Sequence, residues 1–211
     1  MNLSDLRREY KRAELRLEDV AQDPVVQFER WYEEATRAQI PEPNAMCLST
    51  ANKEGIPSSR MVLLKYFGRD GFVFFTNYHS RKAREIASNP NGALLFFWQP
   101  LERQVRIEGK IERISKAASL RYFVSRPRGS QIGAWVSEQS SVISTKGIIL
   151  TKFEEMKRKF VNREIPLPDF WGGFRVIPGS FEFWQGRENR LHDRLHYYQE
   201  KKDWKIERLA P

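Results

Sequence analysis

The feature that most constrains the fold of this chain is a run of strand-like segments between residues 45 and 114. β-branched and aromatic residues are concentrated there in short segments separated by turn-forming stretches, a pattern typical of β-strands. One turn is especially clear, because Gly68 and Gly71 bracket Arg69-Asp70 between two such segments. The predicted strands cover residues 45–50, 58–66, 72–76, 93–98 and 103–114. Together they indicate a meander of long β-strands.

Helices are predicted on both sides of this meander. Residues 1–40 are polar with a helical pattern that breaks near Pro24, and a short helix follows Ser80, whose hydroxyl suits a helix N-cap. A third helix is predicted over residues 115–124, followed by a polar loop over residues 125–131. A longer helix carries apolar residues at helical spacing, which we expect to be core contacts: Ile149, Phe153, Met156 and Phe160.

The C-terminal quarter returns to strand patterns. Strands are predicted over residues 171–177, 180–185, 196–199 and 204–208. The whole pattern predicts an α+β protein that is mostly β, an antiparallel β-barrel surrounded by helices. The chain has 211 residues, 40% of them hydrophobic, so residues 1–211 are expected to form a single domain with a sizeable core.

Charge and hydropathy narrow the class of partner. The longest apolar runs are too short to cross a bilayer and the first residues are charged, so we expect a cytoplasmic protein that does not bind membranes. The 36 Lys and Arg residues against 27 Asp and Glu residues give a net charge of +9, which favours phosphate-bearing partners. An RNA-binding module is one alternative, since Phe72, Phe74 and Phe75 loosely resemble the aromatic strand of an RNA-recognition module. The order of elements argues against it, and no nucleic-acid partner is predicted.

A strand-to-helix junction at residues 75–82 carries groups that bind phosphate. Free backbone N–H groups at a helix start, the hydroxyls of Thr76 and Ser80, and the cations Arg81 and Lys82 all favour a bound phosphate. Because residues 58–66 and 72–76 are expected to pair across their turn, Arg60 is expected near the same helix start. No dinucleotide or P-loop glycine motif is present, so a mononucleotide phosphate is the open possibility.

Residues 181–194 crowd aromatic, amide, imidazole and guanidinium groups into one segment. If residues 190–194 are extended, Arg190, His192 and Arg194 point to one face. Such a cluster is costly to bury without an anionic partner, which neighbouring carboxylates or a ligand can supply.

Other site chemistries have little support in the sequence. His192 and His196 have metal-ligand spacing only on a helix, and Cys47 is the only cysteine, so no metal site and no intrachain disulfide is predicted. No serine stands in a G-x-S-x-G nucleophile motif.

With these segments in view, nearly all of the chain resembles the pyridoxamine 5'-phosphate oxidase (pyridoxine 5'-phosphate oxidase) family. The resemblance is most specific at residues 60–65, 75–77, 80–82, 101–106, 125–130, 137–140, 183–187 and 190–194. It implies an FMN-binding split β-barrel and a homodimer with two flavins at the subunit interface. It also implies oxidation of pyridoxamine or pyridoxine 5'-phosphate to pyridoxal 5'-phosphate by dioxygen, which releases hydrogen peroxide. Another FMN split-barrel oxidoreductase is a second alternative.

The resemblance also implies which residues bind FMN. Those of one subunit are Arg60, Met61, Val62, Leu63, Leu64, Lys65, Phe75, Thr76, Arg81, Lys82 and Gln104, and the partner is expected to add Gln139, Ser140, Trp184 and Arg194. Phe75 departs from the family pattern, because some relatives carry tyrosine there and this chain lacks that hydroxyl.

The substrate site follows from the same resemblance. The substrate phosphate is assigned to Lys65, Tyr122, Arg126 and Ser130, and the reacting end to Arg190, Leu191 and His192, of which Arg190 and His192 are the expected catalytic residues. Residues 1–20 are expected to act as a lid over the bound substrate, with Arg7 and Tyr10 in contact with it.

Overall fold

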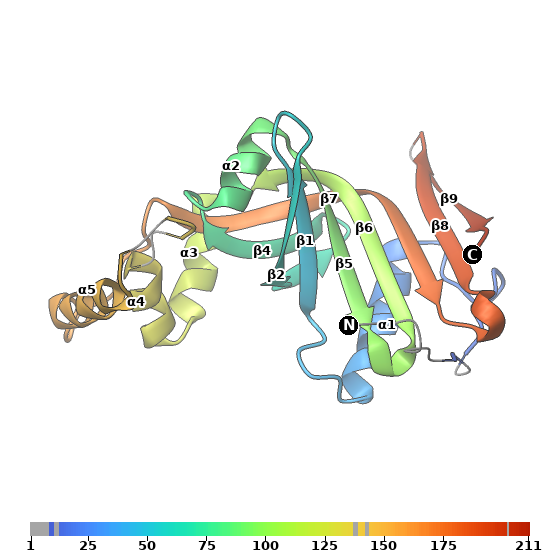
Figure 1. Ribbon diagram of the computed structural model, residues 1–211, viewed down its shortest axis with the longest axis horizontal. Helices are drawn as coiled ribbons and strands as arrows, with labels where there is room; N and C mark the ends of the chain where they lie inside the picture. Colours follow the sequence, from blue (N-terminus) through green and yellow to red (C-terminus); the bar gives the residue numbers. More distant parts are fainter. Residues whose placement is uncertain (1–8, 11–12, 137–138, 142–143, 202) are drawn as a thin grey trace.

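Figure 1 shows the computed structural model, which describes residues 9–10, 13–136, 139–141, 144–201 and 203–211. Its centre is one nine-stranded antiparallel sheet. The strands are β1 (Ala45–Ala51), β2 (Pro57–Leu63), β3 (Tyr66–Gly68), β4 (Gly71–Asn77), β5 (Asn91–Trp98), β6 (Arg103–Arg113), β7 (Trp171–Gln185), β8 (Asp193–Glu200) and β9 (Asp203–Leu209). The helices are α1 (Pro24–Arg37), α2 (Arg81–Ser88), α3 (Lys116–Ser125), α4 (Arg128–Val136) and α5 (Lys146–Lys159). The predicted mostly β fold is confirmed.

The sheet curls back on itself at Leu64 and Lys65. Its strand order is β2-β1-β5-β6-β7-β4-β3, so β2 and β3 lie at opposite ends of the order although they are consecutive in the chain. The Leu64 N–H donates to the Asn44 carbonyl at 2.9 Å, and the next N–H, of Lys65, donates to the Val73 carbonyl, also at 2.9 Å. The chain therefore changes partners within two residues. The predicted single strand over residues 58–66, paired with residues 72–76, is wrong for this reason: β2 pairs with β1 and only β3 pairs with β4.

Strand β7 is the longest element and joins the two ends of the molecule (Figure 1). Its first half pairs with β4, its second half with β8, and nearly all of it with β6. We predicted two strands here, but a bulge opposite Gly109 absorbs the irregularity and the strand continues. A Cβ atom at Gly109 would lie 1.9 Å from the Ile177 carbonyl oxygen, so only glycine permits this close approach.

Helix α1 supplies part of the barrel core. Asp23 caps it by accepting a hydrogen bond from the Val25 N–H at 2.8 Å, and Pro24 suits the first turn. Phe28 is fully buried, and its ring centroid lies 5.0 Å from those of Phe72 and Phe96. The described residues before Asp23 form turns and irregular chain, so the helix predicted over residues 1–40 is confirmed only for its second part.

Helices α3, α4 and α5 gather at one end of the sheet, opposite β8 and β9 (Figure 1). They enclose a second apolar cluster that includes Phe123, Phe160 and Trp171, against which Ile149, Phe153 and Met156 pack as predicted. Helix α4 begins at Arg128, so the loop predicted over residues 125–131 is shorter than expected. No helix of the described residues is long and apolar enough to cross a membrane.

Candidate active site

A cavity of about 610 Å³ lies where β2 and β4 meet helices α3 and α4. It brings together most of the residues predicted for one subunit's flavin and for the substrate phosphate. These are Met61, Val62, Leu63, Lys65, Phe75, Thr76, Lys82, Tyr122, Arg126 and Ser130. Gln139, which was expected from a partner subunit, lines the same cavity. A second hollow of about 630 Å³, lined mainly by small and apolar residues around Gly92, Gly109 and Gly179, contains none of the predicted site residues.

One end of the cavity is basic and centred on Lys82. This side chain is only 7% exposed, and its Nζ donates to Thr76 Oγ1 at 3.2 Å and to Gln139 Oε1 at 3.1 Å. Burial, together with the charge of Arg60, lowers the pKa of Lys82 to about 8, although Glu85 opposes the shift. An ammonium group held this way is stabilised by an incoming anion.

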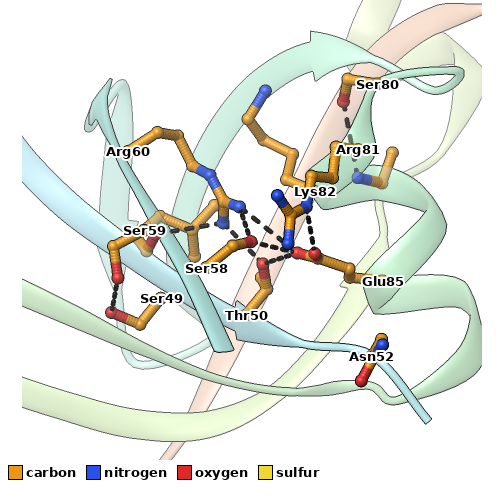
Figure 2. A network of polar contacts seen from close by, with 12 residues as sticks. Ser49, Thr50, Asn52, Ser58, Ser59, Arg60, Ser80, Arg81, Lys82 and Glu85 are labelled. Atoms are coloured by element: carbon orange, nitrogen blue, oxygen red, sulfur yellow. Dashed lines mark hydrogen bonds and ion pairs between the residues drawn. The ribbon is translucent and has the colours of Figure 1, made fainter. Parts of the chain in front are cut away.

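Arg60 lies beside α2, as predicted, and its charge acts on Lys82, but it is not among the residues that line the cavity. It lies opposite Leu48 on β1, and its guanidinium extends to Glu85 of α2, with Nη2 3.3 Å from Oε2 (Figure 2). The predicted capping serine is confirmed, because Ser80 Oγ accepts a hydrogen bond from the Ala83 N–H. Arg81, the first residue of α2, also pairs with Glu85.

The other end of the cavity has an aromatic wall and a second cation. Phe75 stacks on Tyr122 at 4.0 Å and on Trp171 at 5.4 Å between ring centroids. The guanidinium of Arg126 lies over Trp171, and its Nη1 is buried without a hydrogen-bond partner among the described residues. Burial lowers the pKa of Arg126, a sign of an incompletely compensated cation. Because an unsatisfied buried donor is costly, this position suits a bound anion.

Three further predicted flavin contacts lie elsewhere, on the face shared by β6, β7 and β8. Gln104 is paired with Trp184, and Trp184 is paired with Arg194, so the three side chains form one cross-strand row. Arg194 makes a two-point ion pair with Glu182, with Nε–Oε1 3.0 Å and Nη2–Oε2 3.1 Å. Glu182 therefore holds the Arg194 end of the row in place.

The residues expected at the reacting end lie beside this row. Arg190 ends a short 3₁₀ turn and has a φ of 61°, so the extended segment predicted over residues 190–194 is wrong before β8 begins. Arg190 and Leu191 are exposed, whereas the His192 ring lies 4.6 Å from that of Trp184. The Arg187 N–H donates to His192 Nδ1 at 3.1 Å, so the neutral ring carries its proton on Nε2. Burial and the nearby Arg190 lower the pKa of His192, which keeps the ring neutral at pH 7.

Of the two residues predicted to contact the substrate from the lid, the structure describes Tyr10. Its ring lies 5.7 Å from Trp184 and 5.9 Å from His192, and it packs over Gly186, where a Cβ atom would lie 2.7 Å from the tyrosine ring. Arg7, the other predicted lid residue, lies outside the described residues.

The structure differs from the expectation at three further flavin positions. Gln139 and Ser140 were expected from a partner subunit, but Gln139 lines the cavity of its own chain and Ser140 Oγ accepts a hydrogen bond from the Arg81 N–H at 3.3 Å. These two residues belong to the segment after α4, and the sequence did not predict that this segment contacts the start of α2. The Leu64 side chain is 4% exposed and lies in the barrel core, because the strand changes partners at this residue.

Comparison with known protein families settles the relationship. The profile described as "Pyridoxamine 5'-phosphate oxidase" matches residues 32–160, and the one described as "Pyridoxine 5'-phosphate oxidase C-terminal dimerisation region" matches residues 171–211. The chain belongs to the pyridoxamine 5'-phosphate oxidase family. Among curated members of this family, a pyridoxine/pyridoxamine 5'-phosphate oxidase of Rippkaea orientalis is 59% identical over the full length of both chains. One from Hydrogenovibrio crunogenus is 54% identical and covers 100% of this chain and 99% of the relative.

Two solved structures share the fold of this chain. PhzG from Burkholderia lata, determined with tetrahydrophenazine-1-carboxylic acid, superposes with a TM-score of 0.89 at 27% identity, covering 95% of this chain and all of that one. A pyridoxamine 5'-phosphate oxidase-related, FMN-binding protein from Nostoc punctiforme has a TM-score of 0.70 at 16% identity, covering 91% of this chain and all of that one, a likeness of fold alone.

Sequence reasoning missed two residues of this oxidase-family site. Trp171 was expected only to begin a strand, and no local pattern marks it as a stacking partner of residues on α3 and β4. Glu85 could have been found, since it stands four residues after Arg81 on a predicted helix, where opposite charges meet.

Proposed function

We propose that this chain is an FMN-dependent oxidase that converts pyridoxamine 5'-phosphate or pyridoxine 5'-phosphate to pyridoxal 5'-phosphate. In this proposal dioxygen is the electron acceptor and hydrogen peroxide is released. The observation that carries it is a single cavity lined by two cations that different helices hold, Lys82 in α2 and Arg126 at the end of α3. Two phosphorylated ligands meeting in one cavity require this arrangement. The names of the relatives with 54–59% identity agree with it.

FMN fits the basic end. Its phosphate would be held by Arg60, Arg81 and Lys82, and Thr76 and Gln139 supply polar groups beside them. When bound, FMN takes up the two electrons that the substrate carbon loses and passes them to dioxygen. The protein contributes orientation and charge stabilisation rather than redox chemistry.

The substrate phosphate fits the Arg126 end. Ser130 lies in the first turn of α4, where backbone N–H groups favour an anion, and Lys65 borders the same cavity. At the reacting end, His192 offers a proton on Nε2, which can hold the amine or alcohol group, while Arg190 orients the ring. Both are the proposed catalytic residues.

We further propose that the functional unit is a homodimer with FMN at the interface. Within one chain, the row of Gln104, Trp184 and Arg194 lies on β6–β8, whereas the cavity lies at the far end of β7. The family's dimerisation region covers residues 171–211 and so includes Trp184 and Arg194. A partner would bring its row to this chain's cavity and complete the site.

Residues 1–211 are proposed as one FMN-binding split-barrel domain whose first 20 residues close over the substrate. The contacts of Tyr10 with Trp184 and His192 support this role. Limited proteolysis checks it: cleavage before residue 20 should slow when substrate analogue is added to the flavin-loaded protein.

The alternatives predict different substrates. PhzG shares 27% identity, and its structure holds tetrahydrophenazine-1-carboxylic acid, which carries a carboxylate and no phosphate. The deciding experiment records the visible spectrum of the purified protein. A flavin band that bleaches on anaerobic addition of pyridoxamine 5'-phosphate supports the proposal. A flavin band that does not respond points to another oxidoreductase, and a colourless protein that cannot be loaded with FMN contradicts the cofactor assignment.

A further inference from the structure

Glu85 lies at the centre of the polar network shown in Figure 2. The residue is only 5% exposed, although it is a carboxylate on a surface helix. Its Oε2 accepts hydrogen bonds from Thr50 Oγ1 at 2.5 Å and Ser58 Oγ at 2.6 Å. These donors stabilise the buried carboxylate, because each hydrogen bond offsets part of the cost of removing the charge from water.

The two oxygens of this carboxylate hold different cations. Oε2 lies 3.3 Å from Arg60 Nη2 of the sheet, and Oε1 lies 2.8 Å from Arg81 Nε of the helix. Glu85 therefore bridges β2 and α2 through two arginines. The Arg60 and Arg81 guanidinium groups converge on the Glu85 carboxylate in Figure 2.

The dependence on Glu85 differs between the two arginines. Arg60 also donates to Thr50 Oγ1 at 2.5 Å and to the Leu48 carbonyl at 3.2 Å, and its side chain is 20% exposed. The Arg81 side chain is 59% exposed, and its ion pair with Glu85 ties it to the surface of the helix. A long exposed side chain held at one carboxylate loses its fixed position when that carboxylate is removed.

The charges of the network match a phosphate monoester. Arg60, Arg81 and Lys82 are three cations, and Glu85 is one carboxylate, so the group carries +2 when Lys82 is protonated. A phosphate monoester carries roughly −1.5 to −2 at pH 7. Burial alone would raise the pKa of Glu85, but the hydrogen bonds from Ser58, Thr50 and Arg81 and the charge of Arg60 lower it to about 2. The carboxylate is therefore ionised throughout the neutral range.

We propose that Glu85 is a positioning residue for the flavin phosphate, because it holds the guanidinium groups of Arg60 and Arg81 together, beside the basic end of the cavity. This inference rests on the proposed function, in which that end binds the FMN phosphate. Glu85 itself, as an anion, does not touch the phosphate. Glu85 affects phosphate binding by holding the two arginines in position.

The test compares FMN with riboflavin, which lacks the phosphate, by fluorescence titration of the apoprotein. Glu85→Gln keeps the shape of the side chain and adds one net positive charge to the network. If only the net charge of the network determined FMN affinity, this variant would bind FMN more tightly. If the positions of the two guanidinium groups determine it, FMN binding weakens despite the added charge. We expect the dissociation constant for FMN to rise at least about 10-fold, comparable to a charged hydrogen bond of about 1.5 kcal/mol, while that for riboflavin stays within about twofold.

Two further variants and one control variant extend the test. Glu85→Asp keeps the charge but is too short to reach both arginines, so it should weaken FMN binding as well. In an Arg81→Ala background, Glu85→Gln should reduce the affinity for FMN less than it does in the wild type, because one of the two arginines that Glu85 holds is already gone. Glu112→Gln, at a pair with Arg175 whose N–O distance is 3.9 Å, is the matched control and should change neither flavin.

The outcomes separate this inference from the proposed function. If the wild type does not prefer FMN over riboflavin, the proposed phosphate site is wrong and the role of Glu85 is overturned with it. If the wild type prefers FMN and Glu85→Gln binds it as well or better, only the role of Glu85 is overturned. A variant that loses FMN and riboflavin equally, with a lower unfolding temperature, shows that Glu85 supports the fold and also overturns it.

Discussion

The guanidinium carbon of Arg126 lies 4.6 Å from the ring centroid of Trp171. Trp171 in turn stacks on Phe75, so the cation rests on an aromatic wall that is fixed by β4 and β7. Stacking of this kind holds a guanidinium without using its N–H donors. Arg126 therefore keeps Nη1 available to an anion and loses little freedom when the anion binds.

Arg126→Ala should lower kcat/KM for pyridoxamine 5'-phosphate by about 10- to 150-fold, since a hydrogen bond to a charged group contributes about 1.5–3 kcal/mol. FMN content should not change. Unphosphorylated pyridoxamine should be a poor substrate whose kcat/KM barely responds, because it has no phosphate for Arg126 to hold. Steady-state kinetics with both amines measure this. Equal losses for both would assign Arg126 to the fold or the flavin, and no loss for either would make it a surface charge.

The affinity of the apoprotein for FMN should fall as the pH rises through about 8, the pKa of Lys82. Burial and Arg60 of β2 disfavour the ammonium form, Glu85 of α2 favours it, and a bound phosphate favours it further. Binding above pH 8 must therefore take up a proton, which weakens it by up to about tenfold per pH unit. Fluorescence titration from pH 7 to 9.5 checks this. Riboflavin should show no such trend, and Lys82→Arg should flatten the FMN curve. An FMN affinity that rises with pH would contradict the assignment.

The same shift has a consequence for stability. The pKa of Lys82 is lower in the folded chain than its ordinary value of 10.5, so the unfolded chain binds more protons between pH 8 and 10.5. This group therefore makes the free energy of unfolding of the apoprotein increase as the pH rises through that window. Lys82→Met should remove the increase, as measured by denaturant unfolding at pH 8 and 10.

Mixing two variants that do not bind FMN tests whether each flavin site is formed by residues of both subunits. Arg60→Ala and Arg194→Ala should each retain little FMN. In a heterodimer of the two, one site has both arginines and the other has neither, so random pairing after joint refolding should restore about a quarter of all sites. Flavin absorbance per chain measures the recovery. No recovery in verified heterodimers would mean that both arginines serve the site of the same subunit.

The positive charge should not make the protein an RNA binder. A chain that used several of its cations on RNA would lose affinity steeply with salt. We expect no submicromolar binding of a labelled RNA at physiological salt. Binding that persists there, and that neither FMN nor pyridoxal 5'-phosphate displaces, would revive the RNA-binding alternative.

The parts of the fold that depend on local chemistry could be predicted from the sequence. The cap at Ser80 and the turn between Gly68 and Gly71 are set by neighbouring residues, and both are present. The change of partners at Leu64 was not predictable, because an uninterrupted apolar run gives no sign of which strand each half will meet. The same limit applies to the site: the motif residues converge as the resemblance implied, but Trp171 becomes visible only when β7 and α3 pack together.

The length of β7 has a final consequence. Trp171 at its start borders the cavity, and Trp184, thirteen residues later, belongs to the row offered to a partner. At about 3.3 Å per residue, the strand is a spacer of roughly 40 Å that sets where each subunit's contribution ends. Because side chains alternate between the two faces, a one-residue slip of β7 against β6 beyond the bulge would turn the distal row inward while leaving the cavity end intact. A chain with that slip would keep its own cavity, but its Trp184 and Arg194 would no longer face a partner subunit.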